Sequence, residues 1–548
     1  MRYSDLGNGR FQNPILFADY SDPDVIRVGD TYYMTASSFN YTPGLPILVS
    51  RDLVNWELKN YALKNIKEER FIIPRHSEGV WAPSIRFHDG MFFIYYGMPD
   101  EGYYVVRTSD PLGEWEEPVC VLEGKGLIDP CPFWDEDGKA YVIHGYAKSR
   151  IGFKSILGIF EMSSDGLSAV SEDHFVFNGN DPKNPAITIE GPKVYKRNGY
   201  YYIWAPAGGV KDGYQVVLRS DNIRGPYEIK KVMHTGKTVI NGPHQGGLVD
   251  TVNGEEWFIH FQDRGLYGRI CHLQPVTWKN DWPIVGINPD VDNCGEPVFE
   301  TDKPDTNYKD EKITCLEASD DFHNGKFNLS WQWLGNHNES FCGIRGEGQN
   351  GLRLYSINPS CEANPVIWRS ANVLTQKLVY PVFETTVKMD ISGLKENEKA
   401  GICMTGGQYL TAYFERKEDS FFIKIAESDG KDSDKKEVVR SCYSCNELFE
   451  DSFELKNISW KMIFDLDDKV DSKELYFQNV YKPLTGNNPS LKISVKSDNG
   501  DYKDLDVNYT PSDHTWVGAK IGIFALSNAV NAIEHGYADF LSVETREL

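Results

Sequence analysis

The chain has 548 residues, a formal net charge of −23 and a globular composition that is 40% hydrophobic and 25% charged. Because a single hydrophobic core stops growing at about 250–300 residues, we expect two large domains. The negative charge argues against nucleic acid or an anionic membrane surface as a partner, and no run of about 20 apolar residues could span a bilayer.

The N-terminus and the cysteines bear on the compartment. The first residues, MRYSDLGNGRFQNP, lack the apolar core of a signal peptide. We therefore expect a cytoplasmic protein, or a periplasmic or secreted one from which a leader has been removed. Ten cysteines are scattered along the chain, and Cys442 and Cys445 form its one C-x-x-C pair. Without a second pair at zinc spacing, free thiols in a reducing compartment are expected.

One hairpin pattern recurs through the first 300 residues: an apolar strand, a glycine-containing turn and an aromatic strand. It occurs at 25–37, 84–97, 132–145, 193–206 and 248–262. A further element follows several copies, at 50–57, 108–118 and 220–228. Five mostly extended units predict a five-bladed β-propeller. A large β-sandwich with coincidental hairpins is the alternative, and the regular spacing makes it less favourable.

A polar, proline-containing stretch at 296–314 ends the repeat and is typical of a linker. Beyond it, alternating segments such as YPVFETTVKMDI, FFIKIAES and AKIGIFALS predict an antiparallel β-sandwich. The charged run at 428–437 fits a solvated hairpin tip. We therefore predict an all-β chain with a propeller domain at 1–305 and a β-sandwich accessory domain at 306–548.

Carboxylates precede three of the repeated hairpins. Asp22 lies in YSDPDVI, Asp129 in GLIDPCPF and Glu190 in ITIEGPKVY, each followed by Pro or Gly-Pro. In a propeller the inner strands converge on the axis, so residues at their starts meet in one pocket. A single Asp-Pro pair is most simply a turn, but three equivalent sites favour a functional constellation. Asp24, beside Asp22, is interpreted as out of phase on the strand and structural.

Facing carboxylates are the groups that glycoside hydrolysis requires. A protonated carboxyl donates its proton to the leaving oxygen, and an ionised one activates water. A third carboxylate nearby raises the pKa of the acid through like-charge repulsion.

The runs 22–56, VWAPSIRF, GLIDPCPF, EGPKVY and GPHQGGLVDT closely resemble glycoside hydrolase family 43. The resemblance implies a five-bladed propeller and hydrolysis with inversion of the anomeric centre. It assigns Asp22 as general base, Glu190 as general acid and Asp129 as the residue that tunes and orients the acid. LSWQWLGNHN (329–338) and YADFLSVE (537–544) resemble the concanavalin A-like sandwich of β-xylosidase-type members.

The same resemblance extends to four further candidates for substrate binding. Trp81 and Phe39 are expected to form sugar-stacking walls, with core packing as the alternative for each. Arg269 matches a family arginine that contacts the substrate, and His244 matches a histidine near the propeller axis. A loop from SWQWLGN is expected to reach the propeller mouth and close one end of the pocket, which favours release of single terminal sugars.

No cofactor is required for this chemistry, but a structural calcium is considered at two places. His244 is expected to hold one through water near the axis. Asp321 in DDF and Asp539 in YADF form a second, weaker candidate in the sandwich.

The predicted function is an exo-acting hydrolase that releases terminal β-D-xylose, α-L-arabinofuranose or both from plant polysaccharide fragments, a neutral substrate that suits the negative chain. Retaining sucrose- and fructan-cleaving propellers are disfavoured, because their NDPNG and RDP motifs are absent. An endo-acting arabinanase-like hydrolase and a non-catalytic carbohydrate-binding propeller remain as alternatives. A scaffold for protein contacts would not explain three acidic strand entrances. The oligomeric state is open, a homo-oligomer included.

Overall fold

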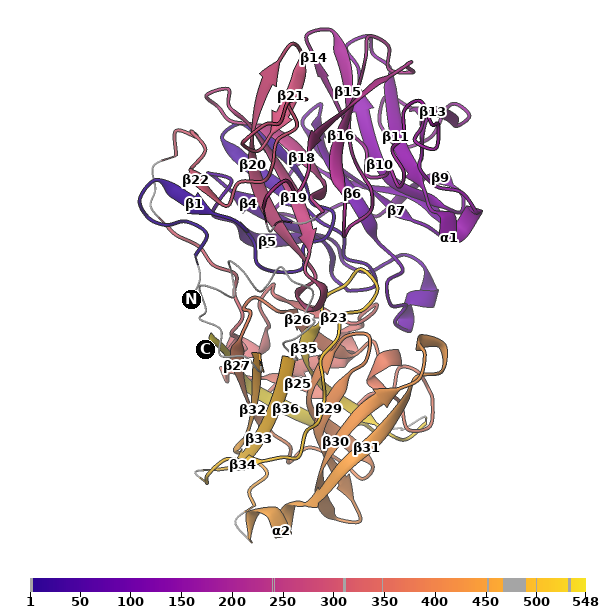
Figure 1. Ribbon diagram of the computed structural model, residues 1–548. Coiled ribbons are helices and arrows are strands. Elements are labelled where there is room, and N and C mark those ends of the chain that lie inside the picture. Colours follow the sequence, from indigo (N-terminus) through magenta and orange to yellow (C-terminus); the bar gives the residue numbers. More distant parts are fainter. Residues whose placement is uncertain are drawn as a thin grey trace.

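A computed structural model describes residues 3–238, 240, 242–308, 312–346, 348–450, 453–466, 489–498, 500–530 and 534–548. The chain forms two β-rich bodies stacked end to end, with both termini near their junction (Figure 1). The N-terminal body is a propeller of five four-stranded antiparallel sheets, and the C-terminal body is a sandwich of two seven-stranded sheets. The predicted fold class is confirmed.

Each blade takes four consecutive strands in chain order. The first two blades comprise β2 (Asp24–Val28), β3 (Thr31–Thr35), β4 (Gly44–Ser50), β5 (Glu57–Leu63), β6 (Trp81–His88), β7 (Met91–Met98), β8 (Gly102–Thr108) and β9 (Val119–Glu123). The next two comprise β10 (Leu127–Trp134), β11 (Ala140–Tyr146), β12 (Ile156–Met162), β13 (His174–Asn178), β14 (Lys193–Arg197), β15 (Tyr200–Ala207), β16 (Tyr214–Ser220) and β17 (Glu228–Met233). Blade five comprises β18 (His244–Asp250), β19 (Glu256–Asp263), β20 (Arg269–Lys279) and β21 (Trp282–Val285).

The five predicted hairpins are the two inner strands of the five blades. Their turns need glycine because the backbone there is left-handed, with φ between 64° and 86° at Gly29, Gly90, Gly138, Gly199 and Gly254. The predicted further elements at 50–57, 108–118 and 220–228 fall at the connections from the third strand to the fourth. Buried side chains from neighbouring blades pack together, as Ile94 and Tyr96 of β7 do with Leu45 and Ile47 of β4.

The sandwich follows a connecting segment that includes β22 (Glu300–Asp302). Its strands are β23 (Trp331–Trp333), β24 (Cys342–Ile344), β25 (Leu352–Tyr355), β26 (Val373–Lys377), β27 (Phe383–Asp390), β28 (Glu398–Thr405), β29 (Leu410–Lys417), β30 (Ser420–Asp429), β31 (Lys436–Ser444), β32 (Ile458–Leu466), β33 (Pro489–Ser497), β34 (Lys503–Asp504), β35 (Lys520–Ser527) and β36 (Tyr537–Glu547). The predicted hairpin tip at 428–437 joins β30 to β31.

Helices are few and short, and none among the described residues is long and apolar enough to cross a membrane. They are α1 (Lys148–Ile151), α2 (Cys445–Phe449) and the 3₁₀ turns η1 (Glu69–Ile72), η2 (Gly265–Tyr267), η3 (His323–Gly325), η4 (Glu339–Phe341), η5 (Ile367–Arg369) and η6 (Asp432–Asp434). All ten cysteines are free thiols.

The N-terminal segment closes the propeller ring by crossing from blade one to blade five. β1 (Arg10–Gln12) pairs with β22, outside any blade. The buried amide of Asn13 then donates to the carbonyls of Leu273 (2.8 Å) and Val298 (2.9 Å) and accepts from the Leu273 N–H (2.8 Å). The Tyr20 N–H donates to the Arg269 carbonyl at 2.9 Å. The segment therefore joins the two ends of the ring.

Replacing Asn13 by Ala should destabilise the propeller by about 2–4 kcal/mol, because three buried backbone groups lose their partner at once. Urea unfolding followed by tryptophan fluorescence measures the loss. The exposed Asn8, whose side chain accepts from the nearby Arg10 N–H, supplies the control Asn8→Ala, expected within about 0.5 kcal/mol of the native protein. Equal midpoints for the two variants would contradict this account of ring closure.

Candidate active site

The inner strands of the propeller begin with irregular backbone. The pairing register shifts within β6, β10 and β18, which marks a β-bulge near each strand entrance. Ala82, Asp129 and Gln245 lie in these bulges with positive φ, and Asp22 adopts φ 55° just ahead of β2. Left-handed backbone is costly for residues other than glycine and clusters at functional sites. In this propeller, the left-handed backbone turns side chains away from the directions of a regular strand, at equivalent positions in different blades.

Asp22 is almost fully buried, and its carboxylate is surrounded by donors. One oxygen accepts hydrogen bonds from the hydroxyls of Ser21 (2.7 Å) and Ser37 (2.6 Å). The other accepts from Arg269 Nη1 at 3.0 Å. An ionised carboxylate only accepts hydrogen bonds, so this environment suits the charged form that a general base requires.

Asp24 is structural, although the reason differs from the one expected. In a regular strand, residues two apart share a face, so alternation alone would not separate Asp24 from Asp22. The left-handed backbone at Asp22 breaks that alternation. The buried Asp24 carboxylate instead accepts from the Ile85 N–H (2.9 Å) and from Arg86 Nη1 (2.6 Å), and so joins blade one to blade two.

Asp129 is buried at the start of β10, where it accepts a hydrogen bond from the Gly191 N–H at 2.8 Å. Burial, followed by the negative charges of Glu190 and Asp22, raises the pKa of Asp129 to about 8. The three predicted carboxylates therefore interact electrostatically in one site, and the buried member retains a proton at neutral pH.

Glu190 is the most accessible of the three, with 31% of its side chain exposed. Its Oε1 lies 3.1 Å from His244 Nε2, which fits donation from the imidazole. Gly191 follows with φ 56°, and a Cβ there would lie 2.6 Å from the Gln245 side chain. The Glu-Gly pair thus lets Glu190 approach the axis beside β18, while its carboxyl stays within reach of solvent.

Arg269 is buried and lies against the predicted general base. Its guanidinium binds the Ser21 hydroxyl (2.8 Å) and Asp22, and lies 4.5 Å from the centre of the Phe261 ring. The structure thus places the predicted substrate-binding arginine against the predicted general base, and its contact with the substrate stays a prediction.

Aromatic side chains from both domains, Trp81 and Phe39 of the propeller and Trp516 of the sandwich, form what we call the aromatic wall. Trp81 and Phe39 belong to one buried cluster, and the Trp81 indole N–H donates to the Ser77 carbonyl at 3.0 Å. Trp516, from the loop between β34 and β35, packs edge-on against Trp81 with ring centroids 4.8 Å apart. Trp516 remains 38% exposed, so its ring is available to a ligand. Sequence reasoning missed it, since a tryptophan in a polar loop of another domain carries no motif.

The segment at 329–338 also contacts the propeller, as expected, and its Leu334 belongs to the same buried cluster as Trp81. Thr42 pairs with Trp333 through a β-bridge, and the Thr42 hydroxyl donates to the Gly335 carbonyl at 2.6 Å. Asn336 accepts from the Ile66 N–H at 2.8 Å. This segment anchors the sandwich to blade one, whereas the loop that carries Trp516 lines the site.

The structure bears on one of the two considered calcium sites, and the water-mediated calcium at His244 stays a prediction. Calcium takes six to eight oxygen ligands, and among the described residues His244 is not part of any converging group of three or more His, Cys, Asp or Glu side chains. Both oxygens of Asp539 are bound by Arg353, at 2.8 and 2.9 Å, and Arg345 lies 3.5 Å away. Asp321 is exposed and accepts from Asn350. Arginines therefore already neutralise the Asp539 carboxylate.

A cavity of about 580 Å³ lies at the opposite ends of the inner strands, and it is not the catalytic site. None of the three carboxylates lines it. Its cations are paired within the protein, for example Arg27 with Asp250 and Lys196 with Asp135.

Family models and known proteins identify the family of this chain. The model of Glycosyl hydrolases family 43 matches residues 11–283, and that of the β-xylosidase C-terminal concanavalin A-like domain matches 319–546. A putative β-xylosidase of Xylanibacter ruminicola is 38% identical over 74% of this chain and 72% of its own length. The chain belongs to glycoside hydrolase family 43. It is a glycoside hydrolase.

Two further relatives extend the comparison. A non-reducing end α-L-arabinofuranosidase of Bacteroides ovatus is 29% identical over 72% of this chain and 74% of its own length. The solved structure of a xylan β-1,4-xylosidase from Bacillus halodurans has a TM-score of 0.76 at 22% identity and covers 98% of this chain and 100% of its own. At that identity the structural match supports the fold of both domains together.

The raised pKa of Asp129 predicts that its replacement by a neutral residue increases stability and lowers activity. Since this pKa lies above the ordinary value of 3.8 for an aspartate, the folded protein keeps a proton that the unfolded chain releases, and stability falls as pH rises from about 4 to about 8. Asp129→Asn removes that penalty. The variant should melt higher than the native protein, by a margin that grows from pH 5 to pH 8, while kcat/KM falls at least about 100-fold.

Calorimetric scans of both proteins at several pH values measure the margin. The exposed Asp137, in the hairpin turn of blade three, supplies the control Asp137→Asn, for which no growing margin is expected. A margin for Asp129→Asn that is constant or shrinks with pH would contradict a buried, protonated Asp129.

Proposed function

We propose that this hydrolase removes single pentose residues, β-D-xylose, α-L-arabinofuranose or both, from the non-reducing ends of plant cell-wall oligosaccharides, with inversion. The observation that carries the proposal is the convergence of Asp22, Asp129 and Glu190 beside an aromatic wall that the sandwich completes. The names of the relatives, which include both β-xylosidases and an α-L-arabinofuranosidase, support the substrate class.

In the proposed reaction, one water replaces the leaving sugar in a single displacement. Asp22 takes a proton from the water as its oxygen attacks the anomeric carbon. Glu190 gives its proton to the glycosidic oxygen as the bond to the anomeric carbon breaks. Ser21, Ser37 and Arg269 hold the Asp22 carboxylate in one orientation. The products are a pentose of inverted configuration and a shortened oligosaccharide.

Asp129 and Glu190 act as a coupled pair in this scheme. Their like charges oppose simultaneous ionisation, so the pair holds one proton through neutral pH. In the free protein the buried Asp129 is the favoured site. A bound sugar covers the more exposed Glu190 and presents an oxygen that accepts a hydrogen bond, which favours the proton on Glu190. His244 contacts the same carboxyl and helps to orient it.

Exo action follows from the position of Trp516. The Trp81–Trp516 pair places sandwich residues against the propeller site, so that a long polysaccharide chain meets the second domain at one end. This arrangement disfavours the endo-acting arabinanase alternative. A carbohydrate-binding protein without catalysis would have no need for the three interacting carboxylates.

Removal of the general acid should slow hydrolysis most for substrates with poor leaving groups. Glu190→Ala should lower kcat/KM for 4-nitrophenyl β-D-xylopyranoside and 4-nitrophenyl α-L-arabinofuranoside by about 10²–10⁴, and for xylobiose by more, because an alkoxide needs the proton that nitrophenolate does not. Glu136→Ala removes a carboxylate that is 86% exposed on a distant hairpin and should be unaffected. Equal losses on both kinds of leaving group would exclude Glu190 as the acid.

The stereochemistry of the product gives an independent test. Proton NMR during hydrolysis of a β-D-xyloside should show α-xylose first, before mutarotation. If β-xylose forms first, the single displacement is wrong. The ratio of the two aryl-glycoside kcat/KM values identifies the preferred pentose, and activity on neither, with internal cleavage of arabinan, would support the endo alternative.

Trp516→Ala should lower kcat/KM for xylobiose by about 3–10-fold, because an aromatic contact contributes about 0.5–1.5 kcal/mol beyond buried area. The loss should fall mainly on KM, since Trp516 does not reach the carboxylates. Phe175→Ala, which removes a ring that is 65% exposed on the outer strand of blade three, is the matched control. Unchanged kinetics in Trp516→Ala would remove the sandwich from the substrate site.

A further inference from the structure

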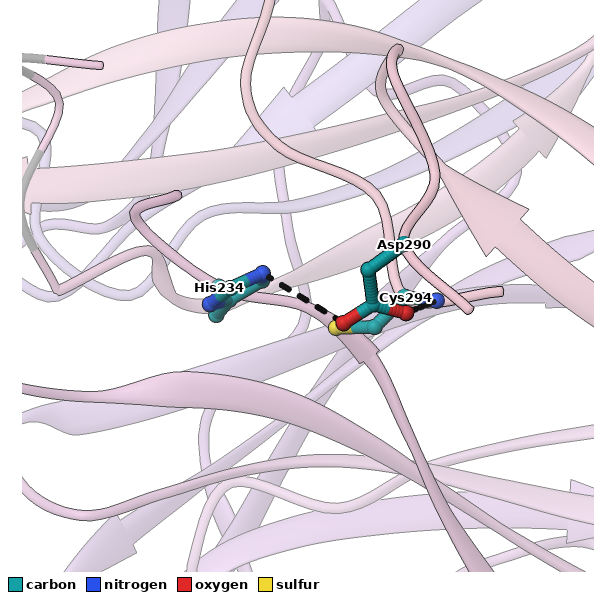
Figure 2. Close-up of side chains that lie close together, drawn as sticks. All are labelled: His234, Asp290 and Cys294. Atoms are coloured by element: carbon teal, nitrogen blue, oxygen red, sulfur yellow. Dashed lines mark hydrogen bonds and ion pairs between the residues drawn. The ribbon is translucent and has the colours of Figure 1, made fainter. Parts of the chain in front are cut away.

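Three potential metal ligands converge at the outer side of the propeller, away from the carboxylates of the active site. His234 directly follows β17 of blade four, and Asp290 and Cys294 lie in the segment after β21 of blade five. Figure 2 shows the three side chains pointing toward one another. One donor atom from each lies within 4.8 Å of the other two, and His234 Nε2 is 3.9 Å from Asp290 Oδ2.

The backbone on both sides of this cluster is fixed. Met233 and Gly295 form a parallel β-bridge, the His234 N–H donates to the Gly295 carbonyl at 3.1 Å, and the Gly295 N–H donates to the Val232 carbonyl at 3.0 Å. The ligand-bearing segments of blade four and of the chain after blade five are therefore held together before any ion binds.

The Asp290 carboxylate is oriented by its own turn. Its Oδ1 accepts from the N–H groups of Asp292 (2.9 Å) and Cys294 (3.0 Å). These bonds aim Oδ2 at His234. The 3.9 Å separation of these two groups is too long for a hydrogen bond, so the side chains face each other across a gap.

Cys294 completes the donor set from the buried side. The residue is only 3% exposed, and its thiol makes a weak contact with the Gly295 carbonyl at 3.9 Å. The side chains of His234 and Asp290 are 41% and 43% exposed. An ion bound by one buried sulfur and by two ligands at the surface would keep one coordination position that faces solvent.

We propose that His234 Nε2, Asp290 Oδ2 and Cys294 Sγ bind one Zn²⁺, with water as the fourth ligand. Zinc bonds of about 2.0–2.3 Å in a tetrahedron place ligand atoms about 3.3–3.8 Å apart, so small side-chain rotations close the present separations. Nitrogen, oxygen and sulfur together suit Zn²⁺, whereas Ca²⁺ and Mg²⁺ prefer oxygen ligands alone.

The bound ion would tie the outer strand of blade four to the segment that leaves blade five. Lys231 lies close enough to interact with both Asp290 and Cys294, and its positive charge opposes a cation. We therefore expect a reversible site that stabilises the propeller and takes no part in hydrolysis.

Cobalt provides a spectroscopic test, since Co²⁺ occupies zinc sites and its bond to a thiolate gives a charge-transfer band in the near ultraviolet. Tag-free, full-length protein is stripped with a chelator and titrated with Co²⁺. The native protein should develop the band with an endpoint at one ion per chain, lose it on addition of Zn²⁺, and melt at a higher temperature with Zn²⁺ than without.

Three variants locate the site. Cys294→Ser should abolish the band, and His234→Ala, at a half-exposed position that tolerates substitution, should weaken Co²⁺ binding at least tenfold. Cys442→Ser, which removes the exposed thiol of the C-x-x-C pair, should leave the band unchanged. A cooperative thermal transition of each metal-free variant near that of the metal-free native protein reports that each is folded.

The proposal is wrong if the native protein shows no band at stoichiometric cobalt, or if the band survives Cys294→Ser. A band that persists unchanged in His234→Ala would exclude the three-ligand site. None of these outcomes depends on which glycoside the enzyme hydrolyses.

Discussion

The buried ion pair between Arg269 and Asp22 holds the propeller and its chemistry together. A propeller is a ring, and its last blade must be fixed to its first. Arg269 begins the third strand of blade five, and its guanidinium reaches the carboxylate that precedes blade one at 3.0 Å, with both side chains 8% exposed. Loss of either partner would leave an unpaired buried charge, a penalty of about 3–5 kcal/mol. The contact that closes the ring is thus also the one that orients the proposed general base.

A cluster of acids at a buried axis works against stability, and the surrounding structure limits the cost. The Asp22 carboxylate has an arginine and two hydroxyls as donors. Lys193, fully buried at the start of β14, donates from Nζ to the Pro83 carbonyl and to the Ser84 hydroxyl and lies near enough to counter charge on Asp129. Asp129 itself avoids the remaining cost by keeping a proton. The carboxylates of the site therefore have unequal surroundings: Asp22 is surrounded by hydrogen-bond donors, and the buried Asp129 keeps a proton. In the proposed reaction the base and the acid are Asp22 and Glu190, so the proton held by Asp129 must pass to Glu190 when the sugar binds.

The sequence predicted the blades well, because each is encoded locally. Alternating apolar residues and a glycine that supplies positive φ define a hairpin without reference to the rest of the chain, and five copies define the ring. The three carboxylates could be found because equivalent strand entrances repeat. Trp516 and the group of His234, Asp290 and Cys294 could not, since their neighbours come from other blades or from the other domain. The structural role of Asp24 was predicted correctly, but strand alternation does not support the argument that was used for it. The left-handed backbone at Asp22 is what separates the two side chains, and no residue pattern predicts that conformation for an aspartate.

Asp19 connects the ring closure to the second domain. Its two carboxylate oxygens accept from the Arg269 N–H and from the Gly518 N–H, both at 3.0 Å, and Lys520 Nζ lies 3.5 Å away. Gly518 stands two residues after Trp516, and on the other side of that tryptophan His514 contacts the Ser77 hydroxyl at 2.7 Å. The loop that carries Trp516 is thus held at both ends by propeller residues. Because residues 19–22 close the ring, present the proposed base and anchor this loop, a shift of the sandwich would disturb the catalytic carboxylate as well as the wall of the pocket. The sandwich is for this reason an integral part of the proposed active site.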